Sequence, residues 1–269
     1  MSSDDDIDLI GDDYDIDDDI DSKFDRIFPK LKHKKLEDGF KKDKVVNQVL
    51  DKSTMFTMYE MINSKIISYV NGIIKAGKES VLFWAVDTKG NDVALKVFLV
   101  TTSSFKKRLT YIEGDPRFTH LKHGTRNMVY LWAKKEFRNL QQCIKTNLPV
   151  PRPIYVSKNV LAMEFMGKNG VPFPTLHETE VDEKDYGQLI QIIIDLYHKA
   201  NLVHCDLSEY NVFKTDNGLV FFDLGSAVDT EHPNALNFLE RDIKNVSYFF
   251  AKRGLTVVNP ADIIQKIIS

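Results

Sequence analysis

The first regular pattern of apolar positions lies in residues 55–70, where Met, Ile and Tyr side chains recur at helical spacing and predict a helix. Short apolar runs follow. They are separated by turn residues at Gly77 and Gly90, and they predict three strands between residues 73 and 98. Residues 126–145 carry an apolar stripe along one face, which predicts a second helix.

The second half of the chain has a different pattern. A proline-rich break at residues 149–153 precedes two predicted strands over 154–165. A Gly- and Pro-rich segment at 167–174 follows and is expected to connect the two lobes. Apolar residues at helical spacing then predict a helix over 182–200. Another helix is predicted after Asn259, because asparagine caps helices and a proline comes next. Most of the predicted strands lie before residue 166 and mainly helices are predicted after residue 181, which fits an α+β protein with two lobes.

The chain of 269 residues is 43% hydrophobic and 28% charged, which is enough for one large core or for two lobes with a cleft between them, and we expect two lobes. We expect residues 1–54 to form an acidic and then basic disordered or linker segment. Residues 55–163 would form a small lobe with an N-terminal helix, and residues 164–269 a hinge and a large lobe. The sequence shows no leader peptide and no apolar run that would span a bilayer, so we expect a cytoplasmic protein.

The net charge of −3 is unevenly distributed. Residues 1–25 hold twelve Asp and one Lys, a charge of −11, so residues 26–269 together carry +8. An acidic, apolar-poor segment of this kind predicts disorder. The basic remainder is compatible with a nucleic-acid partner, although diffuse positive charge more often reflects ordinary solvated surface.

Four polar residues near the middle of the second half have the spacing of a catalytic site. His204, Asp206 and Asn211 form a His-x-Asp-x4-Asn pattern, and Asp223 ends the next apolar strand. In kinases this spacing holds one carboxylate beside the acceptor hydroxyl and turns the amide toward magnesium, and the later Asp completes the metal site. The motif alone leaves a second interpretation open, in which these are a buried histidine, a turn aspartate and a capping asparagine.

A single lysine, Lys96, interrupts an apolar strand, and Glu136 lies near the middle of the following helix. A strand lysine is commonly solvent-facing at an edge, and a helix glutamate commonly pairs along its own helix. The order of strand lysine and then helix glutamate is also the one that a kinase small lobe requires, where the glutamate holds the lysine toward the nucleotide phosphates. We therefore predict an ion pair between Lys96 and Glu136.

Several segments of the chain carry residues that are specific to one family. They are residues 77–80, 94–96, 105–108 with 114–118, 132–140 and 204–211. Together they resemble the RIO family of atypical serine/threonine protein kinases, and its type-one subgroup fits best. The resemblance implies a two-lobed protein-kinase-like fold with an antiparallel sheet and a helix in the small lobe, a mainly helical large lobe and a shortened activation segment. The Leu-Gly-Ser that follows Asp223 departs from the Val-Ser-Gln often seen in type-one members.

The resemblance also implies roles for individual residues. Lys96 is similar to the phosphate-binding lysine and Glu136 to its ion-pair partner. Asp206 resembles the catalytic aspartate, and Asn211 and Asp223 resemble the magnesium ligands. Asp223 also matches the position at which the family forms a transient aspartyl phosphate.

The nucleotide would lie between the lobes, according to the same resemblance. Gly77 and Lys78 belong to the expected phosphate loop, and Met163 resembles the gatekeeper of the adenine site. Glu164 and Met166 would supply the backbone groups that bind adenine. The implied cofactors are ATP and Mg2+.

The function implied by the resemblance is that of a serine/threonine kinase or ATPase that acts on the immature small ribosomal subunit and its ribosomal RNA. Two alternatives remain open at this point. One is a small-molecule phosphotransferase of the aminoglycoside-kinase type, which shares the His-x-Asp-x4-Asn loop. The other is an assembly factor that binds ATP as a conformational ligand. The polar segment 101–125 predicts a mobile loop, with Ser103 or Ser104 as candidate autophosphorylation sites.

Overall fold

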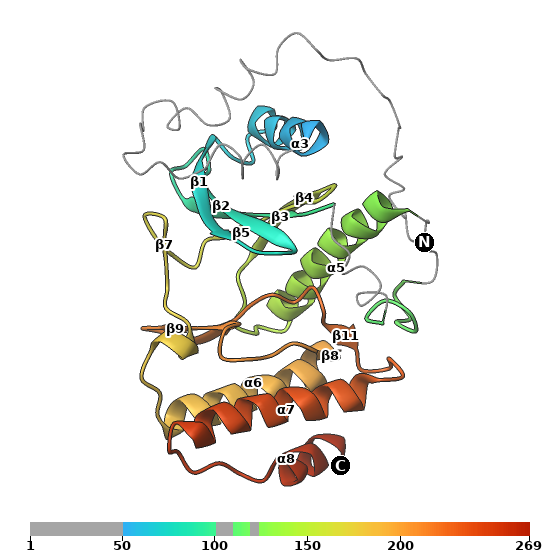
Figure 1. Cartoon of the computed structure of the whole chain (residues 1–269), viewed down its shortest axis with the longest axis vertical. Helices are drawn as coiled ribbons and strands as arrows, with labels where there is room; N and C mark the ends of the chain where they lie inside the picture. Colours follow the sequence, from blue (N-terminus) through green and yellow to red (C-terminus); the bar gives the residue numbers. More distant parts are fainter. Residues whose placement is uncertain (1–50, 101–109, 119–123) are drawn as a thin grey trace.

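The computed structural model describes residues 51–100, 110–118 and 124–269 of the chain. It has two lobes, which lie one above the other in Figure 1. A five-stranded sheet with helices α3 and α5 forms the upper, small lobe, and helices α6, α7 and α8 dominate the lower, large lobe. The acidic segment that is predicted to be disordered, residues 1–25, lies outside the described residues.

The small-lobe sheet is antiparallel and has the strand order β1-β2-β3-β5-β4. Its strands are β1 (Tyr69–Ala76), β2 (Ser80–Val86), β3 (Asp92–Phe98), β4 (Pro153–Ser157) and β5 (Val160–Glu164). Successive side chains of a strand point to opposite faces, so Leu95 and Val97 pack into the core beneath α3 while Lys96 points into the cleft between the lobes. The predicted strands are confirmed. The lobe boundary expected after residue 163 stays a prediction.

Helix α3 (Lys52–Asn63) covers the outer face of the sheet (Figure 1). Its predicted range, residues 55–70, is wrong at both ends. The Asp51 side chain caps the N-terminus by accepting a backbone N–H at 2.8 Å, so residues 52–54, predicted as linker, form the first helical turn. The helix ends before Lys65, whose φ of 61° is left-handed, and the apolar residues beyond it lead into β1.

Helix α5 (Thr125–Lys145) agrees with the predicted helix over residues 126–145. It runs along the sheet and reaches toward the large lobe (Figure 1). Its apolar face joins the main core, which continues into the large lobe. The buried part of this helix also contains three polar side chains, those of Lys135, Glu136 and Asn139. Buried polar groups need partners, and these three have them in the site described below.

The large lobe is built on α6 (Glu183–Ala200), α7 (Ala235–Lys252) and α8 (Pro260–Ile268). Helices α6 and α7 lie side by side, with α8 beneath them (Figure 1). Asn259 caps α8 as predicted, because its side chain accepts a backbone N–H at 3.0 Å. Within the described ranges, no helix combines the length and the apolar character that a membrane crossing requires.

Short strands position two loops of the large lobe below the sheet. The strands are β6 (Gly167–Lys168) with β7 (Val171–Pro172), β8 (Leu202–Val203) with β11 (Val228–Asp229), and β9 (Val212–Thr215) with β10 (Gly218–Phe221). We call residues 204–211, between β8 and β9, the catalytic loop, and residues 222–227, between β10 and β11, the metal loop. Residues 230–234 connect β11 to α7 directly, which confirms the short activation segment.

Candidate active site

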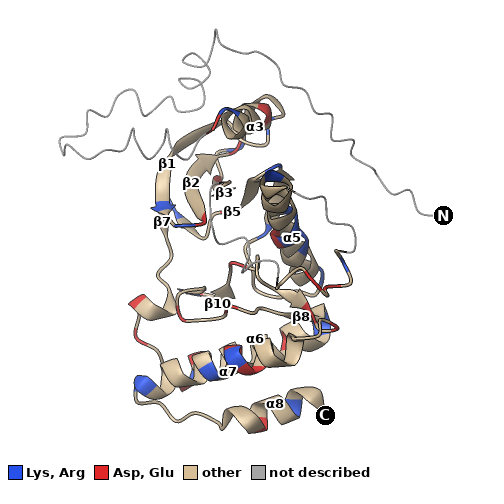
Figure 2. Ribbon diagram, turned by 45° about the vertical axis from the view of Figure 1, so that its right-hand side comes forward, with Lys and Arg blue, Asp and Glu red and all other residues tan. Residues whose placement is uncertain are grey.

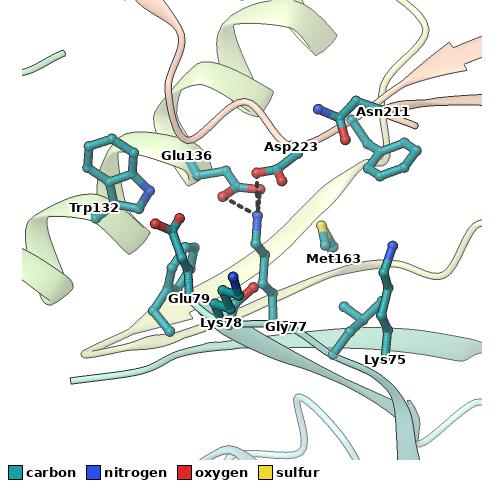
Figure 3. A pocket seen from close by; sticks show the side chains of 14 residues that line it. Lys75, Gly77, Lys78, Glu79, Trp132, Glu136, Met163, Asn211 and Asp223 are labelled. Atoms are coloured by element: carbon teal, nitrogen blue, oxygen red, sulfur yellow. Dashed lines mark hydrogen bonds and ion pairs between the residues drawn. The ribbon is translucent and has the colours of Figure 1, made fainter. Parts of the chain in front are cut away.

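A cavity of about 280 Å³ lies between the two lobes. Its walls come from β1, β2 and the turn between them, from β3, α5 and β5, and from the catalytic and metal loops. Figure 3 shows the side chains of these elements converging from opposite sides. Residues that are far apart in the sequence therefore meet at one place.

Lys96 and Glu136 form the predicted ion pair across the back of the cavity. The Lys96 Nζ donates to Glu136 Oε1 at 2.8 Å and to Oε2 at 2.7 Å (Figure 3). Lys96 is 8% exposed and Glu136 is 1% exposed, so solvent hardly screens the pair. This geometry confirms the contact and excludes the interpretation in which Lys96 faces solvent at a sheet edge.

The same ammonium makes a second ion pair, to the metal loop. Lys96 Nζ lies 2.7 Å from Asp223 Oδ1. Burial disfavours the charged ammonium, but the carboxylates of Asp223 and Glu136 outweigh burial and raise the pKa of Lys96 above its ordinary value. Lys96 therefore carries its charge throughout the physiological pH range and connects the small lobe to the large lobe.

The catalytic and metal loops are joined through Asn211. Its side-chain nitrogen donates to the backbone carbonyl of Asp206 at 2.8 Å, and the backbone carbonyl of Asn211 accepts the backbone N–H of Phe222 at 3.0 Å. Because the amide nitrogen is used in this way, the side-chain oxygen of Asn211 is left as a ligand atom. Both Asn211 and Asp223 line the cavity (Figure 3).

The donor set of these two residues fits magnesium. An amide oxygen from Asn211 and a carboxylate from Asp223 are hard oxygen ligands, and protein sites for Mg2+ commonly use one or two carboxylates together with substrate phosphates. In the part of the chain that the structure describes, three or more His, Cys, Asp or Glu side chains do not come together as a metal cluster. A metal here would therefore need further oxygens from the nucleotide or water.

Asp206 lies beside the cavity and does not line it. Partial burial, which removes water from the carboxylate, and the negative charge of Asp223 raise the pKa of Asp206, although its side chain still reaches solvent. The predicted His204 is buried, and its Nε2 lies 2.9 Å from the carbonyl of Phe222. His204 thus connects the catalytic loop to the metal loop.

Asp242 of α7 holds the catalytic loop in place and has no counterpart among the residues predicted from sequence. Its carboxylate accepts the backbone N–H of Cys205 at 2.7 Å and that of Leu207 at 3.1 Å, on either side of Asp206. Burial raises the pKa of Asp242 to about 7. An aspartate among the apolar positions of residues 235–252 was the available signal, because a buried carboxylate needs dedicated donors.

The residues predicted to contact the nucleotide are only partly brought together. Gly77 and Lys78 line the cavity from the β1–β2 turn, and Met163 lines it from β5 (Figure 3). Glu164 and Met166 do not line it. The Glu164 backbone N–H and the Met166 carbonyl already take part in backbone hydrogen bonds, both at 2.8 Å. Adenine binding by their remaining backbone groups stays a prediction.

Comparisons with known proteins agree with this geometry. A RIO domain matches residues 81–263. The RIO-type serine/threonine-protein kinase Rio1 of Haloferax volcanii is 38% identical over 212 residues, which cover 78% of this chain and 73% of that protein. The human serine/threonine-protein kinase RIO1 is 34% identical over 255 residues, which cover 91% of this chain and 45% of the relative. This chain therefore spans less than half the length of the human relative.

A solved structure shows the same fold. The Rio2 kinase–ADP/Mg2+–phosphoaspartate complex from Chaetomium thermophilum matches with a TM-score of 0.59 at 21% identity, over 78% of this chain and 65% of that one. At this level of identity the likeness concerns the fold alone. The domain match and the identity to the Haloferax volcanii protein go further, and they show that the chain belongs to the RIO family.

Proposed function

We propose that this chain is an ATP-dependent serine/threonine protein kinase that also hydrolyses ATP. The observation that carries the proposal is the Lys96 ammonium, held 2.7 Å from both Glu136 and Asp223 inside the cavity between the lobes. Phosphoryl transfer needs a fixed cation for the phosphates next to a carboxylate for the metal, and this arrangement provides both. The names of the curated relatives support the same activity.

Each residue of the site has a definite task in this mechanism. Asn211 and Asp223 would hold Mg2+, which when bound neutralises the charge on the phosphate oxygens. Lys96 fixes the α and β phosphates. Asp206 orients the acceptor hydroxyl and accepts its proton, and the raised pKa of Asp206 makes it a stronger base than an ordinary aspartate. The protein contributes position and charge more than covalent chemistry.

Asp223 is the proposed acceptor when no hydroxyl acceptor is bound. The solved Rio2 complex contains a phosphoaspartate by name, and Asp223 resembles the family position that carries it. In this step a carboxylate oxygen of Asp223 bonds to the γ-phosphorus, the bond from the γ-phosphorus to the bridging oxygen breaks, and ADP leaves. Water then hydrolyses the acyl phosphate, which gives net ATP hydrolysis.

We also propose that the protein acts in the cytoplasm on the immature small ribosomal subunit and its RNA. The support is the family resemblance and the positive charge of residues 26–269. Figure 2 shows Lys and Arg residues of the described part of the chain interspersed with Asp and Glu residues over helices of both lobes, so it marks out no single basic groove there. The candidate autophosphorylation sites Ser103 and Ser104 lie outside the described residues.

An assembly factor that uses ATP only as a conformational ligand is the second candidate, because the residues that bind the nucleotide are the same ones that would turn it over. The small-molecule phosphotransferase has less support, since the relatives that match are protein kinases by name. Single-turnover phosphate release, measured with and without immature small subunits, distinguishes the kinase or ATPase from the assembly factor. If ATP is only a conformational ligand, it is not hydrolysed in either condition and no phosphate is released.

The two aspartates provide the direct test of the mechanism. Asp206→Ala should retain Mg2+-dependent ATP binding and lose turnover by about 100-fold or more, because Asp206 contacts the acceptor and not the metal. Asp223→Ala should impair both binding and turnover. A hydroxylamine-sensitive phosphoenzyme should form on the native protein and disappear in Asp223→Ala. Turnover that survives in both variants would contradict the proposed function, and a phosphoenzyme that persists in Asp223→Ala would exclude Asp223 as its site.

A further inference from the structure

Two buried polar residues of α5 reach across to the backbone of the metal loop. Lys135 Nζ donates to the carbonyl of Gly225 at 3.0 Å and also to that of Ala227. Asn139 Nδ2 donates to the carbonyl of Leu224 at 2.8 Å and to that of Ala227 at 3.1 Å. The helix that carries Glu136 therefore also binds the backbone directly after the metal-ligating aspartate.

The direction of the Asn139 amide is determined by its neighbours. Arg117 Nη1 donates to Asn139 Oδ1 at 2.8 Å, and the Asp115 carboxylate holds Arg117 at 2.7 Å. If the amide were turned over, its oxygen would face two carbonyl oxygens and its NH2 would face a guanidinium. Arg117 therefore keeps the Asn139 nitrogen directed at the metal loop.

Lys135 is an unusual residue to find in a core. Its side chain is 0% exposed, and lysine is almost never fully buried unless it has partners. The hydrogen bonds described here go to carbonyls of the metal loop, so Lys135 binds backbone at the site and not a surface carboxylate. A buried lysine costs free energy, which makes a purely space-filling role a poor explanation for it.

The metal loop needs this support, because its first part is strained. Asp223 has a φ of 66°, in the left-handed region that is strained for a non-glycine residue. The loop also lies directly on α5. A Cβ on Gly225 would come within 2.7 Å of Trp132 Nε1 and 3.1 Å of Glu136 Oε2. Contacts from α5 thus fix the backbone on the C-terminal side of the strained residue.

We propose that Lys135 and Asn139 are positioning residues that hold the metal loop so that Asp223 presents its carboxylate to magnesium and to Lys96. This inference rests on the proposed function and adds two residues that act through Asp223. Without the four donated hydrogen bonds, the metal loop is released from α5 and Asp223 can relax to negative φ, which moves its carboxylate out of the site.

The test removes the donors and measures metal binding without any need for turnover. ADP affinity is determined by titration calorimetry with and without Mg2+, for the native full chain, Lys135→Met and Asn139→Leu. The native protein should bind ADP more tightly when Mg2+ is present. In both variants this advantage should shrink by about 10–100-fold, the usual effect of losing a residue that orients a metal ligand, while Mg2+-free ADP affinity changes little.

Gln142→Leu is the matched control. Gln142 lies on the same helix and its side chain also donates to a backbone carbonyl, that of Ala200 at the end of α6, away from the metal loop. This variant should lose stability and keep the full Mg2+ advantage. Hydrogen exchange of the Ala227 amide, which donates to the Leu224 carbonyl at 3.2 Å, should accelerate in Lys135→Met and Asn139→Leu and not in the control.

Each outcome of these measurements has one meaning. Variants that lose stability like Gln142→Leu and retain the Mg2+ advantage would overturn the positioning role and leave the proposed function intact. A native protein that gains nothing from Mg2+ would overturn both. If Lys135→Met does not fold, Asn139→Leu and Arg117→Met decide, since Arg117 orients the Asn139 amide and a smaller loss of the same kind is expected.

Discussion

Lys96 connects the two lobes through its ion pairs. Its strand position, opposite Leu82 of β2 and Leu161 of β5, directs the ammonium into the cleft. There it meets one carboxylate from the small lobe and another from the large lobe. A bound nucleotide would compete with Asp223 for this ammonium.

Lys96→Met should therefore reduce ATP turnover strongly. The substitution keeps the aliphatic stem and removes the charge, so we expect a loss of about 100-fold or more in kcat/KM. Lys78→Met, in the exposed β1–β2 turn of the same cavity, should lose less than about tenfold in kcat/KM. The exposed Lys78 side chain can move, whereas the Lys96 side chain is held in place by its ion pairs. Steady-state kinetics of both variants, with circular dichroism as a check on folding, measures the difference. Equal and small losses would refute the role of Lys96.

The sequence predicted the Lys96–Glu136 pair and missed the contact between Lys96 and Asp223. The first was visible because a lysine inside an apolar strand needs a partner, and the following helix offers one. The second depends on how closely the lobes approach, across 127 positions of the chain, and local pattern carries no information on that distance. Asn211 and Asp223 were predicted as magnesium ligands for another reason, since one short hairpin, β9–β10, fixes their spacing in the sequence.

At the scale of elements, α5 has more than one task. It contributes apolar residues to the main core, Glu136 to the cavity between the lobes, and the donors Lys135 and Asn139 to the backbone of the metal loop. Periodicity predicted the helix and its apolar face correctly. It could not show that Lys135 and Asn139 are buried, because in the sequence these two look like ordinary solvated positions. The helix α3 was placed less well, since apolar residues of the approach to β1 extended its apparent period.

The buried Lys135 should make stability depend on pH. Burial, followed by the charge of Arg117, lowers the pKa of Lys135 to about 7, whereas lysine in an unfolded chain titrates near 10.4. Between pH 7 and 9 the unfolded state therefore binds more protons, and the free energy of unfolding rises with pH by up to about 1.4 kcal/mol per pH unit from this residue. The rise is lost as pH falls through the folded pKa.

Urea unfolding at pH 7, 8 and 9 tests this expectation. Burial raises the pKa of the Cys143 and Cys205 thiols, which opposes this rise in every variant, so the informative quantity is the difference between variants. The free energy of unfolding of Lys135→Met should fall relative to that of the native protein as pH rises, and that of Gln142→Leu should follow the native profile. Parallel pH profiles for the native protein and Lys135→Met would show that Lys135 titrates normally despite its burial.

At the scale of the whole molecule, the described residues form two apolar cores that share the sheet. One lies beneath α3 on the outer face, and the other runs from α5 into the large lobe. The cleft residues lie between these cores, so the site depends on the relative position of the lobes. Composition predicted two lobes and a cleft. The division of the core could not be predicted, because it follows from which face of each strand meets which helix.

The charge asymmetry of the chain supports a prediction that is independent of the family. Residues 1–25 carry −11 and residues 26–269 carry +8, and the covalent link gives the acidic segment a high effective concentration at any basic surface of the same molecule. It should therefore compete with RNA. Deletion of residues 1–25 should strengthen binding to ribosomal RNA and steepen its dependence on salt, because more phosphate contacts then release more counterions. Titrations of RNA against the full and shortened chains at three salt concentrations measure both effects, and superimposable curves would mean that the acidic segment does not compete for the RNA site.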